Sequence, residues 1–284
     1  MNDRLKHARW WLGCLALGSA GLFPSGLAWA GDPNDVARFL AGRSCTRCDL
    51  RYENAAGVLA NGIELQGSYM FNINLSNARL LGARIESSNL EAANLERADL
   101  SRANLSRATL TAASLAGATL MGATLQQVVA NQTNFTAADL SNADLTTADL
   151  RGSQFISAFA EDAIFGTADL RGSNFSKARV SGAKFTGANL SGADFRAAHM
   201  NSADMRRVLM AKINLSGARL AYADLTDADL KGANLQGADL TGANLTNANL
   251  QNADLTGAEM GSALLEGANT CGAKLPAGMK PTPC

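Results

Sequence analysis

The sequence contains few of the residues that build an enzymatic site. Its 284 residues include only two histidines, His7 and His199, which excludes a histidine metal cluster and leaves few partners for a nucleophilic pair. None of the 27 glycines belongs to a phosphate-cradling loop. The 25 basic and 25 acidic residues balance, which argues against a nucleic-acid-coating protein. We therefore predict that the protein is not an enzyme and holds no cofactor or metal.

Residues 1–30 have the pattern of a secretory signal peptide. A basic start is followed by an apolar stretch over residues 10–23, too short for the ~20 residues of a membrane span. The tripeptide Ala28-Trp29-Ala30 then predicts cleavage before Gly31. The mature chain would carry 22 basic and 24 acidic residues, lack tryptophan and keep no stable membrane span. We expect a periplasmic or secreted protein.

A five-residue period governs most of the remaining chain. Every fifth residue from Leu65 to Leu265 forms a column of 41 positions, of which 39 are Leu, Phe, Met, Ile or Val. Two residues before each of these, 31 of 41 positions are alanine. The position between them is usually Asp or Asn, whose short side chains suit corners because they accept hydrogen bonds from nearby backbone N–H groups. A period of five fits neither an α-helix nor a simple strand.

Phenylalanine spacing predicts how the five-residue units are arranged. Phe135, Phe155 and Phe175 are 20 residues apart, as are Phe165 and Phe185. Four five-residue sides would close one coil, so that residues 20 apart stack at the ~4.8 Å strand spacing. The large and small columns would then fill a narrow bore, and the other three positions of each unit would face outward.

Runs such as Ala138-Asp139-Leu140-Ser141-Asn142 resemble the A(D/N)LXX motif of the pentapeptide-repeat family. The resemblance covers about 200 residues in one frame. It implies an all-β fold, a right-handed quadrilateral parallel β-helix of about ten coils, roughly 50 Å long.

The two ends depart from the repeat, and caps are expected because a solenoid leaves its bore open there. Asp32-Pro33 is a typical helix start, so we predict a short capping helix within residues 31–44. The β-helix should occupy 45–275, with an irregular opening coil because alanine fills two of its large positions. Three prolines mark 276–284 as a C-terminal tail.

Four cysteines remain after the predicted cleavage. Cys271 and Cys284 are expected to form a disulfide that holds the tail, worth on the order of 3 kcal/mol. Cys45 and Cys48 are interpreted as buried structural thiols or a local disulfide. Along a rod they lie about eleven coils from the other pair, which excludes a four-cysteine zinc site.

In the middle of the chain, apolar residues interrupt the outward Asp/Asn position at Val129, Phe159, Ile164 and Leu209. They predict a contact surface in the middle of the rod, for an unknown protein partner or a second copy. Scattered single apolar residues on the surface are the alternative. His199 fills the same outward position and is interpreted as a surface corner residue.

The sequence thus favours an exported, non-enzymatic structural or protein-interaction scaffold. The alternative comes from the family resemblance, because some relatives mimic DNA and protect topoisomerases. Mimicry would need a strongly acidic surface and a cytoplasmic location, and both the near-neutral charge and the predicted signal peptide oppose it. We therefore expect no nucleic-acid partner.

Overall fold

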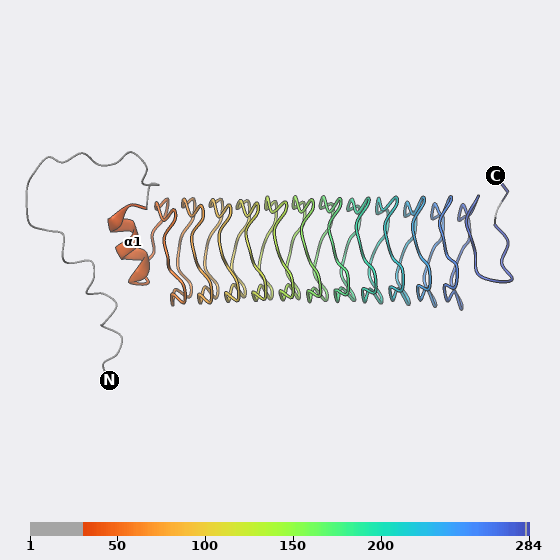
Figure 1. The fold of residues 1–284 in the computed structure, drawn as a ribbon, viewed down its shortest axis with the longest axis horizontal. Coiled ribbons are helices and arrows are strands. Elements are labelled where there is room, and N and C mark those ends of the chain that lie inside the picture. Colours follow the sequence, from red (N-terminus) through yellow and green to blue (C-terminus); the bar gives the residue numbers. More distant parts are fainter. Residues whose placement is uncertain (1–30, 282) are drawn as a thin grey trace, which may run out of the picture.

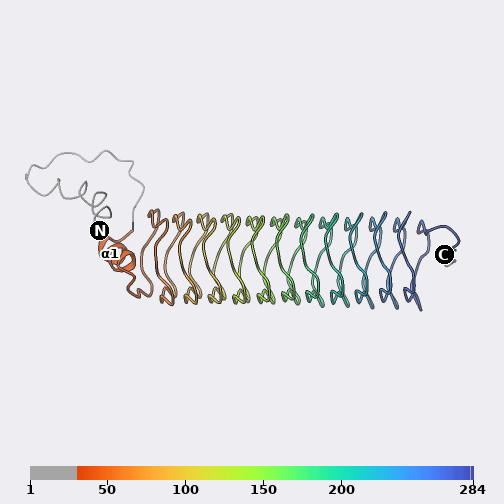
Figure 2. The ribbon, with the colours of Figure 1, turned by 90° about the horizontal axis from the view of Figure 1, so that it is seen from below.

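The computed structural model describes residues 31–281 and 283–284, so the predicted signal peptide lies outside the described residues. One α-helix, α1 (Pro33–Leu40), opens this part of the chain. It is followed by a long rod of stacked coils, and the C-terminus lies at the far end (Figures 1 and 2). In the residues that the structure describes, no helix is both long enough and apolar enough to cross a membrane.

The coils stack with a register of 20 residues. Parallel β-bridges join each outward-facing central residue to the one 20 positions later, from Asp49–Tyr69 to Asp254–Lys274. Each bridge rests on two backbone hydrogen bonds, such as Leu100 N to Thr119 O at 2.7 Å and Thr119 N to Ala98 O at 2.9 Å. Five residues per side and 20 per coil give four sides. Residues 49–274 therefore form about eleven coils.

The opening coil is regular, and the expectation of an irregular one is wrong. Ala55 N donates to Asn74 O and Ala60 N donates to Arg79 O, both at 2.8 Å, in the same register as the later coils. Both alanines are buried. The register is carried by backbone hydrogen bonds, which do not depend on the size of the inward side chain.

Each corner is a tight turn whose second residue has a positive φ. In the corner after Leu100, Arg102 has φ 57° and Ala103 N donates to Leu100 O at 2.9 Å. The preceding Asp99 accepts a hydrogen bond from Ser101 N at 3.0 Å. This is the predicted corner role of Asp and Asn, and it recurs along the rod.

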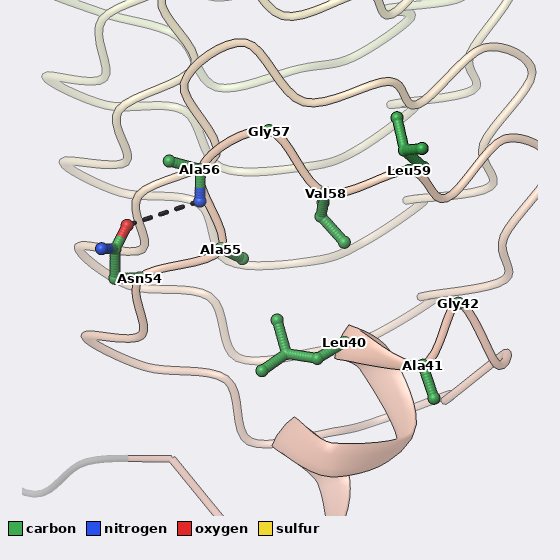
Figure 3. Close-up of a pocket in the computed structure, with 9 residues that line it drawn as sticks. All are labelled: Leu40, Ala41, Gly42, Asn54, Ala55, Ala56, Gly57, Val58 and Leu59. Carbon is green, nitrogen blue, oxygen red and sulfur yellow. Dashed lines mark hydrogen bonds between the residues drawn. The ribbon is translucent and has the colours of Figure 1, made fainter. Parts of the chain in front are cut away.

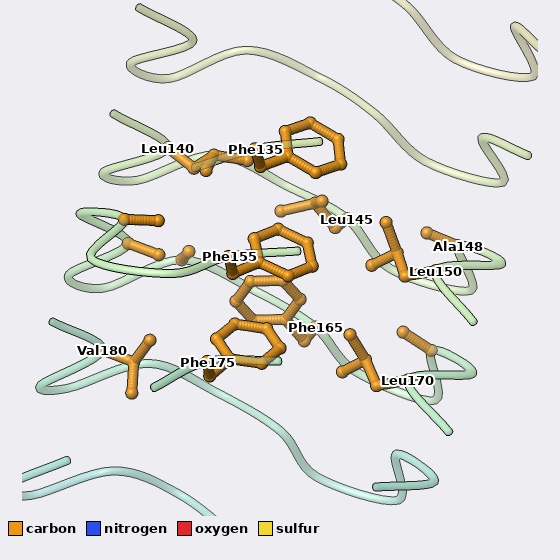
Figure 4. Close-up of a cluster of buried hydrophobic side chains, with 14 of the residues drawn as sticks. Phe135, Leu140, Leu145, Ala148, Leu150, Phe155, Phe165, Leu170, Phe175 and Val180 are labelled. Atoms are coloured by element: carbon orange, nitrogen blue, oxygen red, sulfur yellow. The ribbon is translucent and has the colours of Figure 1, made fainter. Parts of the chain in front are cut away.

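Stacked phenylalanines fill the middle of the bore (Figure 4). The rings of Phe155 and Phe175 are nearly parallel, with centroids 4.3 Å apart. Phe165 packs edge-on against both, with centroids 6.1 and 5.8 Å away. The small residue Ala160 lies between Phe155 and Phe165 in sequence and is fully buried. The predicted 20-residue stacking is therefore confirmed.

Helix α1 packs across the first coil. Asp32 caps it by accepting hydrogen bonds from Asn34 N at 2.8 Å and Asp35 N at 3.2 Å. Phe39 is fully buried and belongs to the same hydrophobic core as the coils. One continuous core therefore runs from the helix into the rod.

Candidate functional site

The four apolar residues singled out by the sequence do not form one patch. Val129 and Leu209 are 38% and 51% exposed and share a face, but four coils separate them by about 19 Å. Phe159 is 40% exposed on a second face, and Ile164 is half-buried on the face after it. Only Phe159 and Ile164 are close neighbours. The contact surface stays a prediction.

A column of two arginines and a histidine adjoins Phe159. The parallel bridges place Arg179, His199 and Arg219 directly after Phe159 on successive coils of one face. We call these four residues the basic column. The guanidinium carbon of Arg179 lies 5.4 Å from the centre of the Phe159 ring, a cation–π contact.

The basic column is bounded by acidic residues. Arg179 Nε is 2.6 Å from Glu161 Oε1, and Asp139 and Asp239 occupy the same outward position before and after the column. His199 was predicted to be a surface corner residue, and its place in a column with Arg179 and Arg219 was not predicted. The 20-residue spacing of Arg179, His199 and Arg219 could have predicted the column, because residues 20 apart share a face when each coil has four five-residue sides.

The stacked aspartates elsewhere on the rod are neutralised by arginines. Asp149 pairs with Arg151 at 2.7 Å, and Asp204 pairs with Arg206 at 2.6 Å. Hydrogen bonds from the Arg206 side chain lower the pKa of Asp204 to about 2, against the opposing effect of burial. The Arg151 side chain likewise lowers the pKa of Asp149. These carboxylates serve corner hydrogen bonds and ion pairs.

Both cysteine pairs are joined by disulfides. Cys271 and Cys284 have Cα atoms 5.0 Å apart, and their bond ties the last residue to the last coil. Cys45 and Cys48 have Cα atoms 5.7 Å apart, and their side chains are buried in the first coil. Of the alternatives for this pair, the structure has the local disulfide.

Asp35 is a site residue that sequence analysis missed. Its Oδ1 lies 3.8 Å from Cys45 Sγ, and its Oδ2 accepts a hydrogen bond from Asp49 N at 3.1 Å. Asp35 lies in the first turn of α1, whereas the cysteines belong to the first coil. Spacing within the repeat carries no signal for Asp35, because the helix supplies this residue.

A hollow lies between the end of α1 and the first coil (Figure 3). Its lining side chains are mostly apolar, and those of Leu40 and Leu59 are more than half exposed. Asn54 Oδ1 accepts a hydrogen bond from Ala56 N at 3.4 Å at its edge. This lining includes no titratable or nucleophilic side chain, so the hollow offers surface for contact and no group for catalysis.

Comparisons with known proteins place this rod among repeat proteins. A family model described as pentapeptide repeats matches in eight copies over residues 88–127 and 133–269, well over half of the chain. A search of curated proteins gave no match.

Solved structures similar to the chain include three repeat proteins. HetL from the cyanobacterium Nostoc, involved in heterocyst differentiation regulation, is 32% identical, with 86% of this chain and 96% of HetL covered and a TM-score of 0.42. Rfr23 from the cyanobacterium Cyanothece is 39% identical over 32% of this chain and 63% of its own, with a TM-score of 0.32. QnrB1, a plasmid-mediated fluoroquinolone resistance protein, is 20% identical over 78% of this chain and 91% of its own, with a TM-score of 0.45.

The family model agrees with the unbroken five-residue frame. The chain therefore belongs to the pentapeptide-repeat family, whose fold is a right-handed quadrilateral β-helix.

Proposed function

We propose that this protein is an exported, non-enzymatic scaffold that binds another protein along one face of its rod. The observation that carries the proposal is the basic column on an otherwise charge-balanced rod. Phe159, Arg179, His199 and Arg219 line one face over four coils, with Asp139 and Asp239 at either end. Two arginines and a histidine in line beside an exposed aromatic ring favour an acidic protein surface as the partner.

The ends of the rod support an exported location. Both disulfides would persist in an oxidising compartment such as the periplasm. We propose that residues 1–30 are removed as a signal peptide, that α1 within 31–44 caps the N-terminal end of a β-helix over 45–275, and that the tail 276–284 covers the other end. This arrangement would leave only the sides of the rod free for binding.

DNA mimicry is the weaker proposal. A mimic needs an excess of unpaired negative charge, whereas Asp149, Asp169, Asp194 and Asp204 each pair with the arginine two residues later. The basic column is also of the wrong sign for this role. N-terminal sequencing of the native protein separates the two proposals, because mimicry requires the leader to remain on an intracellular protein.

The experiment for the scaffold proposal is cross-linking with mass spectrometry in the native envelope. A Phe159→Asp/Arg179→Glu variant should lose the cross-links of the wild type to its partner. Leu264→Asp is the matched control, because Leu264 is an exposed leucine in the same outward position near the C-terminal end. An unchanged cross-link pattern in the double variant would refute the role of this face.

A further inference from the structure

Three possible metal ligands converge where α1 meets the first coil. Asp35, Cys45 and Cys48 have ligand atoms within 4.8 Å of one another. Across residues 31–281 and 283–284, no other set of three or more histidine, cysteine and acidic side chains meets this geometry. The disulfide occupies both sulfur atoms in the present state of the protein.

The Asp35 carboxylate is already oriented as a ligand. Its Oδ2 is fixed by the backbone amide of Asp49, and its Oδ1 points at Cys45 Sγ from 3.8 Å. In a tetrahedral zinc site, Zn–S and Zn–O bonds of about 2.3 and 2.0 Å separate such ligand atoms by roughly 3.5 Å. The observed distance therefore needs little adjustment. A hydrogen bond that fixes the second oxygen is the usual outer support of a metal-binding carboxylate.

We propose that reduction of the Cys45–Cys48 disulfide converts this corner of the protein into a zinc site. A dithiol reductant supplies two electrons and two protons, which break the S–S bond and leave two thiols. Zn²⁺ then replaces both thiol protons and releases them to solvent, and the two thiolates bind it with Asp35 Oδ1. Two thiolates with one carboxylate suit the borderline-soft Zn²⁺.

The surroundings allow an ion and a fourth ligand to enter. Asp35 lines a surface hollow together with Asp32, Asp49, Arg47 and Arg51. The two cysteines are nearly inaccessible, whereas Asp35 is half-buried and faces both the hollow and the sulfur atoms. A water molecule from the hollow completes the tetrahedron.

The disulfide-bonded protein and the reduced, zinc-bound protein differ in which elements they link. The disulfide joins two residues of the first coil and makes no covalent link to α1. Zinc would bridge the coil to the helix through Asp35, so the reduced, metal-bound protein should hold α1 more firmly than the reduced metal-free protein. This inference does not depend on the proposed binding face.

The test uses the purified mature protein, with and without a phosphine reductant, which carries no thiol to compete for metal. Calorimetric titration with Zn²⁺ should show one site per chain after reduction and none before it. Co²⁺ added in place of Zn²⁺ should give the thiolate charge-transfer and visible bands of a tetrahedral site. Amide hydrogen exchange over residues 33–40 should slow when zinc is added to the reduced protein.

Matched variants assign the site. Cys45→Ser/Cys48→Ser should abolish the site, whereas Cys271→Ser/Cys284→Ser should retain it. Loss of an outer-shell partner typically weakens metal binding by about 10-fold or more. Asp35 is a direct ligand in this proposal, so Asp35→Asn should weaken zinc binding at least about 10-fold. Far-UV circular dichroism checks that each variant folds.

Two results would overturn the proposal. One is a reduced wild-type protein that binds no more zinc than Cys45→Ser/Cys48→Ser. The other is an Asp35→Asn protein that binds zinc as tightly as the wild type, which would remove the helix from the site.

Discussion

Tyr222 and Gly242 provide a sharp test of corner packing. Gly242 follows Tyr222 by one coil and has a φ of 65°. A Cβ atom at Gly242 would lie 2.7 Å from both Cδ1 and Cε1 of the Tyr222 ring. Gly237, one corner earlier, has a φ of 62° with nothing within 4 Å of its Cβ position. Alanine at either site would adopt the same left-handed backbone conformation, but only alanine at 242 would clash with another side chain, the Tyr222 ring.

The expected costs follow from this difference. Gly237→Ala should lose about 1 kcal/mol of stability, because an L-residue in the left-handed region is strained. Gly242→Ala must also push the Tyr222 ring out of its rotamer, which adds about 0.5–1.5 kcal/mol. At roughly 2–4 °C per kcal/mol for a chain of this size, the 242 variant should melt a few degrees below the 237 variant. Thermal unfolding followed by circular dichroism measures both.

A double variant isolates the cause. Tyr222→Ala in the Gly242→Ala background removes the clash, so its melting temperature should return toward that of Gly237→Ala. If Gly242→Ala is no less stable than Gly237→Ala, or if removal of the ring brings no recovery, the corner-packing argument fails.

Three further predictions concern the core, the surface and the tail. Phe175→Ala should cost about 3–5 kcal/mol in denaturant unfolding, because the ring contacts four other phenylalanines. The pKa of Asp204 is lowered to about 2 in the folded protein and is near 3.9 when unfolded, so its ion pair stabilises above pH 4 and is lost as pH falls toward 2. The stability difference between wild type and Asp204→Asn should therefore shrink between pH 5 and pH 2. Thiol titration of oxidised, denatured protein should find Cys271 and Cys284 bonded, and Cys284→Ser should lower stability by on the order of 3 kcal/mol.

Each of these predictions has a control on the same rod. Phe159→Ala removes a partly exposed ring with one cation–π contact and should cost only about 1 kcal/mol, so an equal loss at Phe175 and Phe159 would contradict the core argument. Asp162→Asn removes an exposed corner carboxylate, and a pH response matching that of Asp204→Asn would mean that the Arg206 pair is not the cause. Free thiols at both Cys271 and Cys284 would refute the tail disulfide.

The sequence predicted the rod well because a narrow bore tolerates few alternatives. Large residues such as Phe155 and Phe165 can face each other across the bore because the side between them is small, as at Ala160. The 20-residue spacing follows from four equal sides. The wrong or missing predictions concern features that the size of the inward side chains does not determine. Ala55 and Ala60 suggested irregularity, but backbone hydrogen bonds kept the register. The basic column was not predicted, because its members are 20 residues apart and become neighbours only when the four-sided stacking is applied to charged residues as well as to apolar ones.

The position of Asp35 could not be predicted for a different reason. Its place beside Cys45 depends on how α1 lies across the first coil, with Phe39 buried beneath it. A five-residue period describes how each coil sits on the next, and it contains no information about the packing angle of a helix. The position of Asp35 could be learned only from the structure.

The two disulfides lie at the ends of the rod, where a solenoid is expected to unfold first. Each coil contacts only its neighbours, so an inner coil is held by two interfaces and an end coil by one. Opening should therefore begin at the ends, while the stacked phenylalanines hold the middle. Cys45–Cys48 lies in the first coil and Cys271–Cys284 in the last, where closing a loop opposes the easiest unfolding step. Hydrogen exchange after reduction should consequently rise first in the terminal coils and last around Phe165, and uniform exchange along the rod would contradict this order.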